Sequence, residues 1–391
     1  MPSVVQAGIQ ADDLTGACDT GAPFAGRGLR TLVLFPEAAI PAAPPDVLVL
    51  DTESRELPAA EARGRARAAV ARLAECAPAV LYKKVDSTLR GAVAAELAGA
   101  LEGARRPCAI LAPAFPAQRR TVVEGRLRIG GIDAADTAVA RDPAFPATGA
   151  DVLALLGETG PRPIGLIPLA TVRRGPAALA ARLAREPGRA GGALVCDAET
   201  DTDLAVLAGV TAHPPPLLAG SAGLAAALAA RQPGGSRTSI RLRRPLLVVS
   251  GSAHPVTHAQ LARLEARGAR GTWLSGEGPL PVEDATFVAA GAQASADDPA
   301  RRAATVAALV QTARDHVERI TPATLLLTGG ETAISVCRRL GARGIALAGQ
   351  LEPGLALGTL LGGPFDGLTV ITKAGGFGDP DTLRRVWEAC A

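Results

Sequence analysis

Short runs of aliphatic residues alternate with longer stretches rich in alanine, leucine and arginine along most of the chain. Runs of four or five apolar residues are typical of buried strands, whereas the stretches between them, such as Pro58–Glu75 and Ala92–Gly103, have helical spacing. Strands that alternate with helices favour parallel pairing, because a parallel connection needs a long crossover. We therefore predict an α/β protein with mostly parallel sheets flanked by helices.

One segment interrupts this alternation. Residues 231–239 are polar, rich in glycine and proline, and without periodicity, as expected of a linker. A chain of 391 residues is also longer than one hydrophobic core usually serves. We predict two domains, residues 1–232 and residues 240–391, with a ligand cleft between them, where α/β proteins commonly bind small molecules.

The composition excludes several classes of function. Aromatic residues make up only 3% of the chain and the net charge is +3, with the arginines scattered, so we expect no nucleic-acid partner. No apolar run is long enough to span a membrane and no secretion signal is present, so we expect a cytoplasmic protein with no membrane partner. The cysteines are widely spaced and form no C-x-x-C pair, so we expect buried reduced thiols and no structural zinc site.

An acidic pair follows the first apolar run. Asp12 and Asp13 come directly before Thr15 and a stretch of small residues that opens a helix. Carboxylates at the carboxyl end of a first strand face the ligand crevice of an α/β sheet. Asp13 has a structural alternative, since its side chain can cap the helix, and Thr15 either caps the helix or donates to a ligand. Asp12 is harder to explain as a cap and is the first candidate for a general base.

The chain contains 38 arginines but only three lysines, Lys83, Lys84 and Lys373. All three lie at the end of a predicted strand, next to a loop rich in glycine, hydroxyl or acidic residues. A compact ammonium suits a single oxygen of a phosphate or carboxylate. Chance placement is the alternative. The neighbouring glycines, hydroxyls and acids favour the functional interpretation.

Between the strand predicted at Val80–Lys83 and the following helix, charged and hydroxyl side chains are dense: Lys84, Asp86, Ser87, Thr88 and Arg90. Arg90 or Lys84 suits the carboxylate of a small hydroxy acid, and Asp86 suits a hydroxyl. A helix cap followed by solvated charges is the alternative. Arg120, in a later proline-stiffened loop, either holds an anion or is a solvated arginine.

The second half carries four glycine-rich turns, at Ser250–His254, Thr328–Thr332, Gln350–Gly354 and Lys373–Gly378. Glycines let backbone N–H groups approach phosphate oxygens closely, so four such turns favour a nucleotide site. The P-loop motif is absent, and so is a clean dinucleotide fingerprint. These absences exclude a P-loop enzyme and disfavour a dinucleotide fold.

In this order, the motifs at residues 11–17, 83–91, 112–121, 250–252, 328–332 and 373–378 resemble those of the four-carbon acid sugar kinase family. The resemblance implies an N-terminal sugar-acid-binding domain and a C-terminal nucleotide-binding domain. It also implies ATP-dependent phosphorylation of the terminal (4-) hydroxyl of threonate, erythronate or 3-oxo-tetronate. ATP would lie near Ser252, around Glu352-Pro353-Gly354 and at Gly375–Gly378.

The mechanism expected on this basis uses Mg²⁺ and ATP, with Asp12 or Asp13 orienting the hydroxyl and accepting its proton. Residues expected to bind the sugar acid are Thr15, Lys84, Asp86, Ser87, Arg90 and Arg120. Residues expected to bind the nucleotide are Ser250, Ser252, Gly329, Gly330, Glu331, Glu352, Pro353, Gly354, Lys373, Gly375, Gly376 and Gly378.

The chain departs from the family pattern at three positions: Ala374 and Gly376 stand where the family usually has serine and asparagine, and Arg119 where it tends to have glycine. Two other functions stay open at this point. An NAD-dependent sugar-acid dehydrogenase would need a dinucleotide fingerprint that the sequence lacks. A non-catalytic sensor would be stabilised by a ligand without turning it over. The sequence also leaves open which tetronate is used and whether the protein is a homodimer.

Overall fold

The computed structural model describes residues 5–141, 145, 146, 148–185, 191–211, 213–273, 283–290 and 299–390. The chain divides into two compact units. The first unit contains the residues up to Thr31 together with Ala39–Ser236, and the second contains Leu32–Ala38 together with the residues from Arg237 onward. Both units are α/β, and the prediction of mostly parallel sheets is confirmed.

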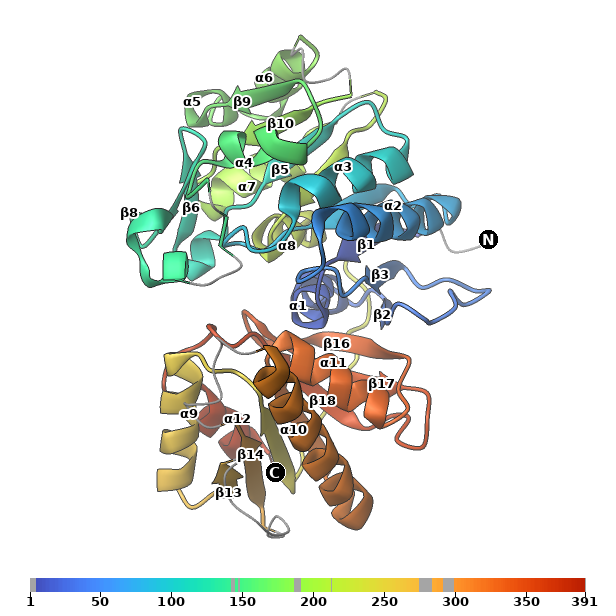
Figure 1. Ribbon diagram of the computed structural model, residues 1–391. Coiled ribbons are helices and arrows are strands. Elements are labelled where there is room, and N and C mark those ends of the chain that lie inside the picture. Colours follow the sequence, from blue (N-terminus) through green and yellow to red (C-terminus); the bar gives the residue numbers. More distant parts are fainter. Residues whose placement is uncertain are drawn as a thin grey trace. The chain divides into compact units, whose positions relative to one another are not determined.

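The first unit is built on a parallel sheet (Figure 1). Its strand order is β3 (Val47–Asp51), β1 (Ala7–Ala11), β4 (Val80–Lys84), β11 (Leu217–Gly220), β5 (Ala109–Ala112), β10 (Ala193–Cys196) and β9 (Ile164–Ile167). Strands β1 and β3 are buried along their whole length, as expected where helices cover both faces. Because β1 lies between β3 and β4, the chain changes direction across the sheet at β1. Ligands of α/β sheets bind at the carboxyl ends of the strands at such a point.

Helices flank this sheet: α1 (Leu14–Ala25), α2 (Ala59–Glu75), α3 (Val93–Ala104), α4 (Val152–Thr159), α5 (Leu169–Val172), α6 (Pro176–Leu183), α7 (Asp201–Ala208) and α8 (Ala222–Ala230). The two helices predicted at 58–75 and 92–103 are confirmed as α2 and α3. These two pack closely because Gly99 and Gly103 lie one turn apart on the same face of α3. A Cβ on either glycine would overlap a backbone carbonyl of α2.

A small antiparallel sheet was not expected from the sequence. It consists of β6 (Arg120–Val123), β7 (Arg126–Ile129) and β8 (Ile132–Asp133), and short 3₁₀ helices flank it at Pro116–Gln118, Ala134–Asp136 and Ala138–Arg141. The Asp197 carboxylate, beyond the end of β10, accepts the N–H groups of Glu124 and Gly125 at 2.9 Å each. This anchors the β6–β7 turn to the main sheet and fixes the position of Arg120.

The sheet of the second unit has the order β13 (Arg270–Trp273), β14 (Ala285–Ala289), β12 (Leu246–Ser250), β15 (Thr324–Thr328), β18 (Thr369–Lys373), β17 (Leu355–Leu361), β16 (Gly344–Glu352) and β2 (Thr31–Leu34). The pairs from β13 to β18 are parallel, whereas β17 is antiparallel to both of its neighbours. The chain changes direction at β12, which lies between β14 and β15. The carboxyl end of β12 is therefore the expected ligand position in this unit.

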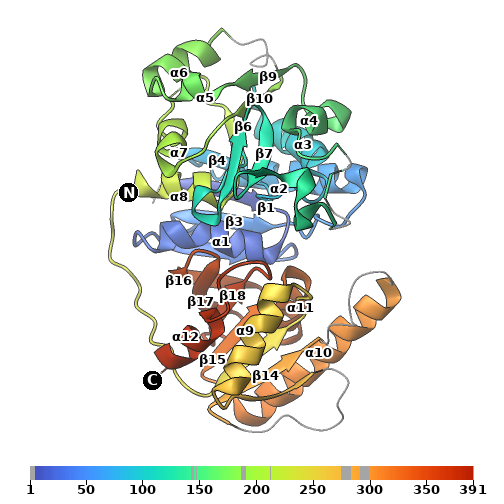
Figure 2. The same cartoon turned by 90° about the vertical axis from the view of Figure 1, so that its left-hand side faces the viewer.

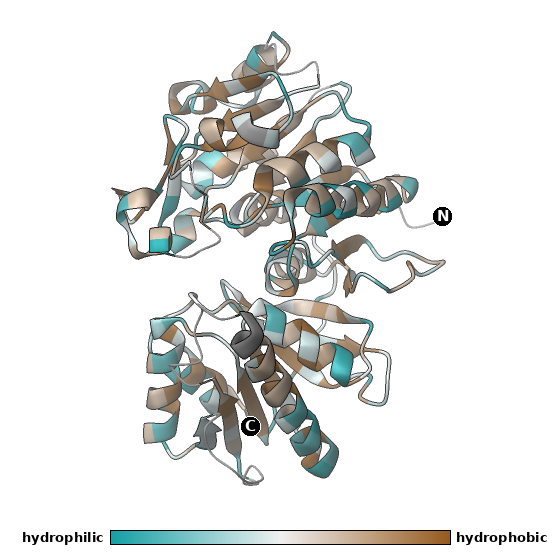
Figure 3. Ribbon diagram, in the orientation of Figure 1, coloured by the Kyte–Doolittle hydropathy of each residue, from teal (hydrophilic) through white to brown (hydrophobic). Residues whose placement is uncertain are grey.

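Four helices described in the second unit are α9 (Pro255–Ala266), α10 (Pro299–Ile320), α11 (Gly330–Arg339) and α12 (Thr382–Ala389). Helices α9 and α12 share a core with one face of the sheet, in which Leu261 and Leu383 pack with Val248, Leu326 and Ile371 (Figure 2). Figure 3 shows the strands mostly brown and the outer helix surfaces partly teal, which agrees with this burial. No helix among the described residues has both the length and the apolar character needed to cross a membrane.

Candidate functional site

A cluster of charged side chains lies at the carboxyl ends of β1, β3 and β4 in the first unit. Asp12 and Asp13 follow β1, Arg55 follows β3, and Lys84 and Asp86 stand at the end of β4. These strands are neighbours in the order β3-β1-β4, so their carboxyl ends share one edge of the sheet. The topology thus brings together residues that are far apart in sequence.

Asp13 caps helix α1. Its backbone is extended, with φ of −148°, and its carboxylate accepts the N–H of Gly16 at 3.0 Å and the hydroxyl of Thr15 at 2.6 Å. A Cβ on Gly16 would lie 2.5 Å from the Asp13 carboxylate, so the cap requires glycine there. A cap of this kind contributes about 1 kcal/mol. The capping alternative for Asp13 is therefore confirmed, and the Thr15 hydroxyl donates to the carboxylate that forms the cap.

Arg55 holds both acids of the pair. Its Nε and Nη2 atoms donate to the two oxygens of Asp12 at 2.7 and 2.9 Å, and Nη2 also donates to Asp13 at 2.6 Å. The Asp86 carboxylate lies 4.0 Å from the same Nη2. Sequence reasoning missed Arg55, since one arginine among 38 carries no motif. The signal that could have found it is its position four residues beyond the end of a buried strand that borders β1.

The charges of this cluster keep Asp12 and Asp86 ionised at neutral pH. Burial alone raises the pKa of Asp12, but Arg55, Lys83 and Lys84 together lower it to about 2. Burial also acts to raise the pKa of Asp86, and Arg90 and Arg55 hold it well below its usual range. Both carboxylates are therefore acceptors only, suited to hydroxyl groups and cations.

Asp86 and Arg90, predicted as two separate ligands of the sugar acid, are paired with each other. Arg90 donates to the two carboxylate oxygens from Nε and Nη2 at 3.0 Å each, and the N–H of Thr88 donates at 3.1 Å. Arg120 reaches the same loop from β6 and donates to the hydroxyl of Ser87. Burial lowers the pKa of Arg120. The loop after β4 is thus ordered by its own charges and by the small sheet.

The two adjacent lysines of β4 have different surroundings, because successive side chains of a strand point to opposite faces. The Lys83 ammonium lies 2.7 Å from the Glu96 carboxylate of α3, and both side chains are buried. Lys84 is also buried, with 5% of its surface exposed, yet its ammonium makes no hydrogen bond or ion pair with any residue that the structure describes. A Cβ on Gly16 would lie 3.2 Å from that ammonium, so Lys84 lies against the first turn of α1.

In the second unit, three glycine-rich turns meet at the carboxyl ends of β12, β15 and β18. Ser250, Thr328 and Lys373 end these strands and are register partners. A Cβ on Gly375 would overlap the Ser252 hydroxyl, so the first and third turns touch. A Cβ on Gly329 would lie 3.5 Å from the N of Ser252, which places the second turn beside the first, and α11 begins with Gly330 and Glu331.

The fourth turn, between β16 and β17, lies against the third. A Cβ on Gly354 would overlap the ring of Phe377, so only glycine permits this contact. Next to Pro353, the carboxylate of Glu352 accepts two hydrogen bonds from Arg385 of α12, at 2.7 and 2.9 Å. The predicted nucleotide residues are thus brought together, with the Glu352 carboxylate already paired.

Lys373 differs from the sequence expectation, which placed its ammonium on the phosphates. The side chain is fully buried and donates to the carbonyls of Ala374 and Gly375 at 3.2 Å each and to the hydroxyl of Thr257 at 3.3 Å. Burial lowers the pKa of Lys373 to about 7. Its ammonium therefore contacts the glycine loop from the inside.

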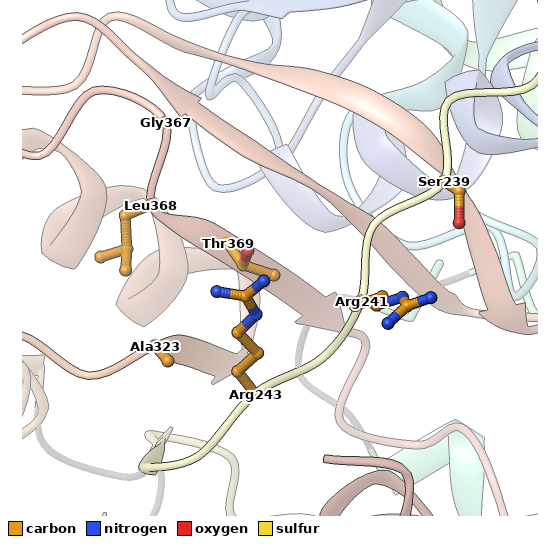
Figure 4. Close-up of a pocket in the computed structure, with 7 residues that line it drawn as sticks. All are labelled: Ser239, Arg241, Arg243, Ala323, Gly367, Leu368 and Thr369. Carbon is orange, nitrogen blue, oxygen red and sulfur yellow. The ribbon is translucent and has the colours of Figure 1, made fainter. Parts of the chain in front are cut away.

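A hollow of about 740 Å³ lies elsewhere in the second unit (Figure 4). It is lined by Ser239, Arg241, Arg243, Ala323, Gly367, Leu368 and Thr369. Both arginines are exposed, and the hollow adjoins the amino ends of β15 and β18 rather than the glycine turns. It is not part of the predicted site. Within the described ranges, no group of three or more His, Cys, Asp and Glu residues is placed to hold a metal ion.

Comparison with known proteins identifies the family. A model described as a sugar-binding N-terminal domain matches residues 7–228, and one described as a nucleotide-binding C-terminal domain matches residues 274–383. A D-threonate kinase of Salmonella typhimurium is 34% identical over 96% of each chain. A D-threonate kinase of Bordetella bronchiseptica is 36% identical over 98% of this chain and 96% of its own. The chain belongs to the four-carbon acid sugar kinase family.

Other members of the four-carbon acid sugar kinase family carry different substrate names. A 3-oxo-tetronate kinase of Methylobacterium radiotolerans is 30% identical over 98% of this chain and 99% of its own. A D-erythronate kinase of Heliobacterium modesticaldum is 29% identical over 95% of this chain and 94% of its own. Family membership alone therefore does not select one four-carbon acid.

Two solved structures are similar over the whole chain. A protein from Salmonella typhimurium LT2, described as a putative tRNA synthase, has a TM-score of 0.80 at 23% identity over 98% of both chains, which shows a shared fold. A domain of unknown function from Bordetella bronchiseptica has a TM-score of 0.50 at 34% identity over 98% of both chains.

Proposed function

We propose that this chain transfers the γ-phosphoryl group of ATP to the terminal (4-) hydroxyl of a four-carbon sugar acid. The observation that carries the proposal is Lys84. Its side chain is largely buried beside the ionised carboxylate of Asp12, and its ammonium makes no hydrogen bond or ion pair among the described residues. Buried charges are normally paired, so an anionic ligand would complete this site. D-threonate is the first substrate to test, because the relatives at 34–36% identity carry that name.

In this proposal Lys84 binds the carboxylate of the sugar acid. The hydroxyls of Thr15 and Ser87, with Arg120 and the Asp86–Arg90 pair behind them, contact the hydroxyl groups. The Arg120 side chain is desolvated and donates to the Ser87 hydroxyl. These contacts support a fixed position for Arg120 at the site, unlike that of a flexible surface arginine. A rigid cluster of donors and acceptors orients a polyhydroxy acid at little entropic cost.

Asp12 orients the attacking hydroxyl and accepts its proton late in the reaction. A carboxylate with a pKa of about 2 is a weak base, but phosphoryl transfer through a loose transition state depends mainly on positioning. The hydroxyl oxygen forms the new P–O bond while the bond to the ADP oxygen breaks, and the proton passes to Asp12. Asp13 supports this arrangement through its cap and its bond to Arg55.

The glycine turns of the second unit bind the ATP phosphates in this proposal. The fit is supported by Gly375, Gly376 and Gly378, whose N–H groups make no hydrogen bond within the described residues. Mg²⁺ is bound in kinases largely through the phosphates, and it neutralises their charge when present. We propose that it enters together with ATP.

The Bordetella structure at 34% identity is described as a domain-swapped dimer with bound citrate. Citrate combines carboxylates with a hydroxyl, as sugar acids do, so its presence in that protein is consistent with a hydroxy-acid site. We extend the proposal to a homodimer of this chain. Light scattering coupled to size-exclusion chromatography will give a mass of twice 39.5 kDa if this is right, and 39.5 kDa if it is not.

A coupled ADP-release assay tests the main proposal. The substrates are D- and L-threonate, D- and L-erythronate and the 3-oxo-tetronates, with five- and six-carbon sugar acids as controls. We expect ADP release with at least one four-carbon acid and with none of the longer acids. Ligand-induced stabilisation without ADP release would favour the sensor instead. NADH binding would support the alternative of an NAD-dependent sugar-acid dehydrogenase, which membership of the kinase family does not favour.

A further inference from the structure

Helix α9 contacts the third glycine-rich turn, the glycine loop Lys373–Gly378, through two buried polar side chains. Thr257 and Gln260 are both fully buried and three residues apart, so they lie on the same face of the helix. The Thr257 hydroxyl donates to the carbonyl of Gly375 at 2.7 Å. The Gln260 amide donates to the carbonyls of Phe377 and Asp379 at 3.1 and 2.8 Å.

Lys373 completes this set from the end of β18. An ammonium has three donors, and the acceptors around this one are the carbonyls of Ala374 and Gly375 and the Thr257 hydroxyl. Its donors are therefore all used inside the protein. Together the three side chains engage four carbonyls of the segment 374–379, Thr257 and Gln260 from α9 and Lys373 next to Thr257.

The N–H groups of the same segment show the complementary pattern. In a planar trans peptide, the C=O of one residue and the N–H of the next point in opposite directions. The carbonyls of Ala374, Gly375 and Phe377 are held inward, so the N–H groups of Gly375, Gly376 and Gly378 point away from α9. These are the three N–H groups that make no hydrogen bond among the described residues.

We propose that Thr257, Gln260 and Lys373 are positioning residues that present the N–H groups of Gly375, Gly376 and Gly378 to the phosphates of ATP. The inference rests on the proposed function of the second unit. None of the three side chains needs to touch the nucleotide, since each acts on a carbonyl that precedes an outward N–H. Successive N–H groups that point to one side form an anion-binding concavity.

Calorimetric titration of three ligands tests the inference: a non-hydrolysable ATP analogue, ADP and adenosine. The variants are Thr257→Val, which keeps the shape of the side chain, and Gln260→Met. Each lost carbonyl contact frees the loop to turn its N–H groups inward. We expect affinity for the ATP analogue and ADP to fall about tenfold or more, the scale of one hydrogen bond, while affinity for adenosine stays unchanged. Thr257→Ser should restore binding.

Thr324→Val is the matched control. Thr324 is equally buried, and its hydroxyl makes two hydrogen bonds, to the N–H and the carbonyl of Arg243, at 3.2 and 2.8 Å. It stands at the amino end of β15, at the other end of the strands from the glycine turns. This variant should lose comparable thermal stability but keep its affinity for the ATP analogue.

Three results would overturn the inference. Folded Thr257→Val and Gln260→Met proteins could bind the ATP analogue as tightly as the parent chain. They could lose adenosine and the ATP analogue equally, which would indicate a general structural role. If the parent chain itself binds no adenine nucleotide, the proposed function of the second unit fails as well. Should Gln260→Met not fold, Gln260→Asn, which shortens the reach of the amide, gives the same comparison.

Discussion

At the scale of single residues, the first unit depends on Arg55. One guanidinium contacts Asp12 through two donors and Asp13 through a third bond, and Asp86 lies at 4.0 Å. The planar guanidinium presents its donors in a fixed arrangement that binds a carboxylate through two bonds, whereas a lysine ammonium acts as a point charge. Arg55 thereby sets both the orientation and the charge of the proposed catalytic acid.

We predict that Arg55→Met will reduce turnover of the sugar acid by at least about 10²-fold, the scale seen when a preorganised charge is removed. Without Arg55 the pKa of Asp12 will rise from about 2, because burial is then opposed only by the lysines. The acidic limb of the pH–rate profile will therefore shift to higher pH. Arg67→Met, an exposed arginine of α2, is the control. An unshifted limb in Arg55→Met would count against the assignment.

We expect substitutions of Asp12 and Asp13 to reduce turnover to different extents. Asp12→Asn should reduce kcat by about 10²–10⁴-fold, the usual range for a general base. Asp13→Asn should be milder, because asparagine caps a helix as well as aspartate does. Steady-state kinetics of the two variants, with circular dichroism to verify folding, makes the comparison. Near-normal turnover of Asp12→Asn would remove Asp12 from its role.

At the scale of elements, β4 separates two adjacent lysines into a structural residue and a proposed binding residue. Lys83 points toward Glu96 of α3, whereas Lys84 points toward the first turn of α1. The alternation of side chains along a strand produces this division without any difference in residue type. The loop after β4 is closed by the Asp86–Arg90 pair. Strand β4 and this loop therefore position both the Lys84 ammonium and the side chains proposed to contact the hydroxyl groups of the sugar acid.

Substitution of each lysine by methionine tests this division. Lys83→Met leaves Glu96 buried without its partner and should cost about 3–5 kcal/mol of unfolding free energy. Lys84→Met removes an ammonium that makes no ion pair but lowers the pKa of Asp12, so the loss of stability should be smaller than in Lys83→Met, while the KM for the sugar acid increases. Denaturant unfolding and kinetics measure the two effects. If both variants lose the same stability and keep the same KM, the lysines do not differ.

At the scale of the whole molecule, the second unit is assembled from two distant parts of the sequence. Leu32–Ala38 belongs to it together with the residues from Arg237 onward. The N–H of Phe35 donates to the carbonyl of Arg343 at 3.0 Å, and a Cβ on Gly344 would overlap the carbonyl of Val33. A single cut near the linker therefore does not reproduce this unit.

We predict that a fragment comprising residues 237–391 will be less stable than the same fragment preceded by residues 29–40 on a flexible tether. Without β2, the edge of β16 leaves backbone donors and acceptors unpaired and open to association with other chains. Thermal unfolding and light scattering of the two proteins give the comparison. Equal melting temperatures and equal monomer fractions would show that β2 contributes nothing to this unit.

Sequence patterns alone predict the α/β class, the family, the acidic pair after β1 and the glycine-rich turns of the second unit. All of these depend on local features, since strands show as apolar runs and parallel strands end at one edge. Sequence patterns did not show the small sheet β6–β8, and of the hairpin β16–β17 they indicated the turn at Gln350–Gly354 but not the antiparallel pairing.

The contacts between distant side chains are visible only in the folded chain. Arg55 reaches Asp12 across 43 positions, and Thr257 and Gln260 reach the third glycine loop across 117–119 positions. The folded chain also pairs Asp86 with Arg90, and it directs Lys373 into the loop. Such contacts depend on strand order and on which face a side chain takes. A one-dimensional pattern does not carry that information, because the energy of a pair depends on distance in space, not in sequence.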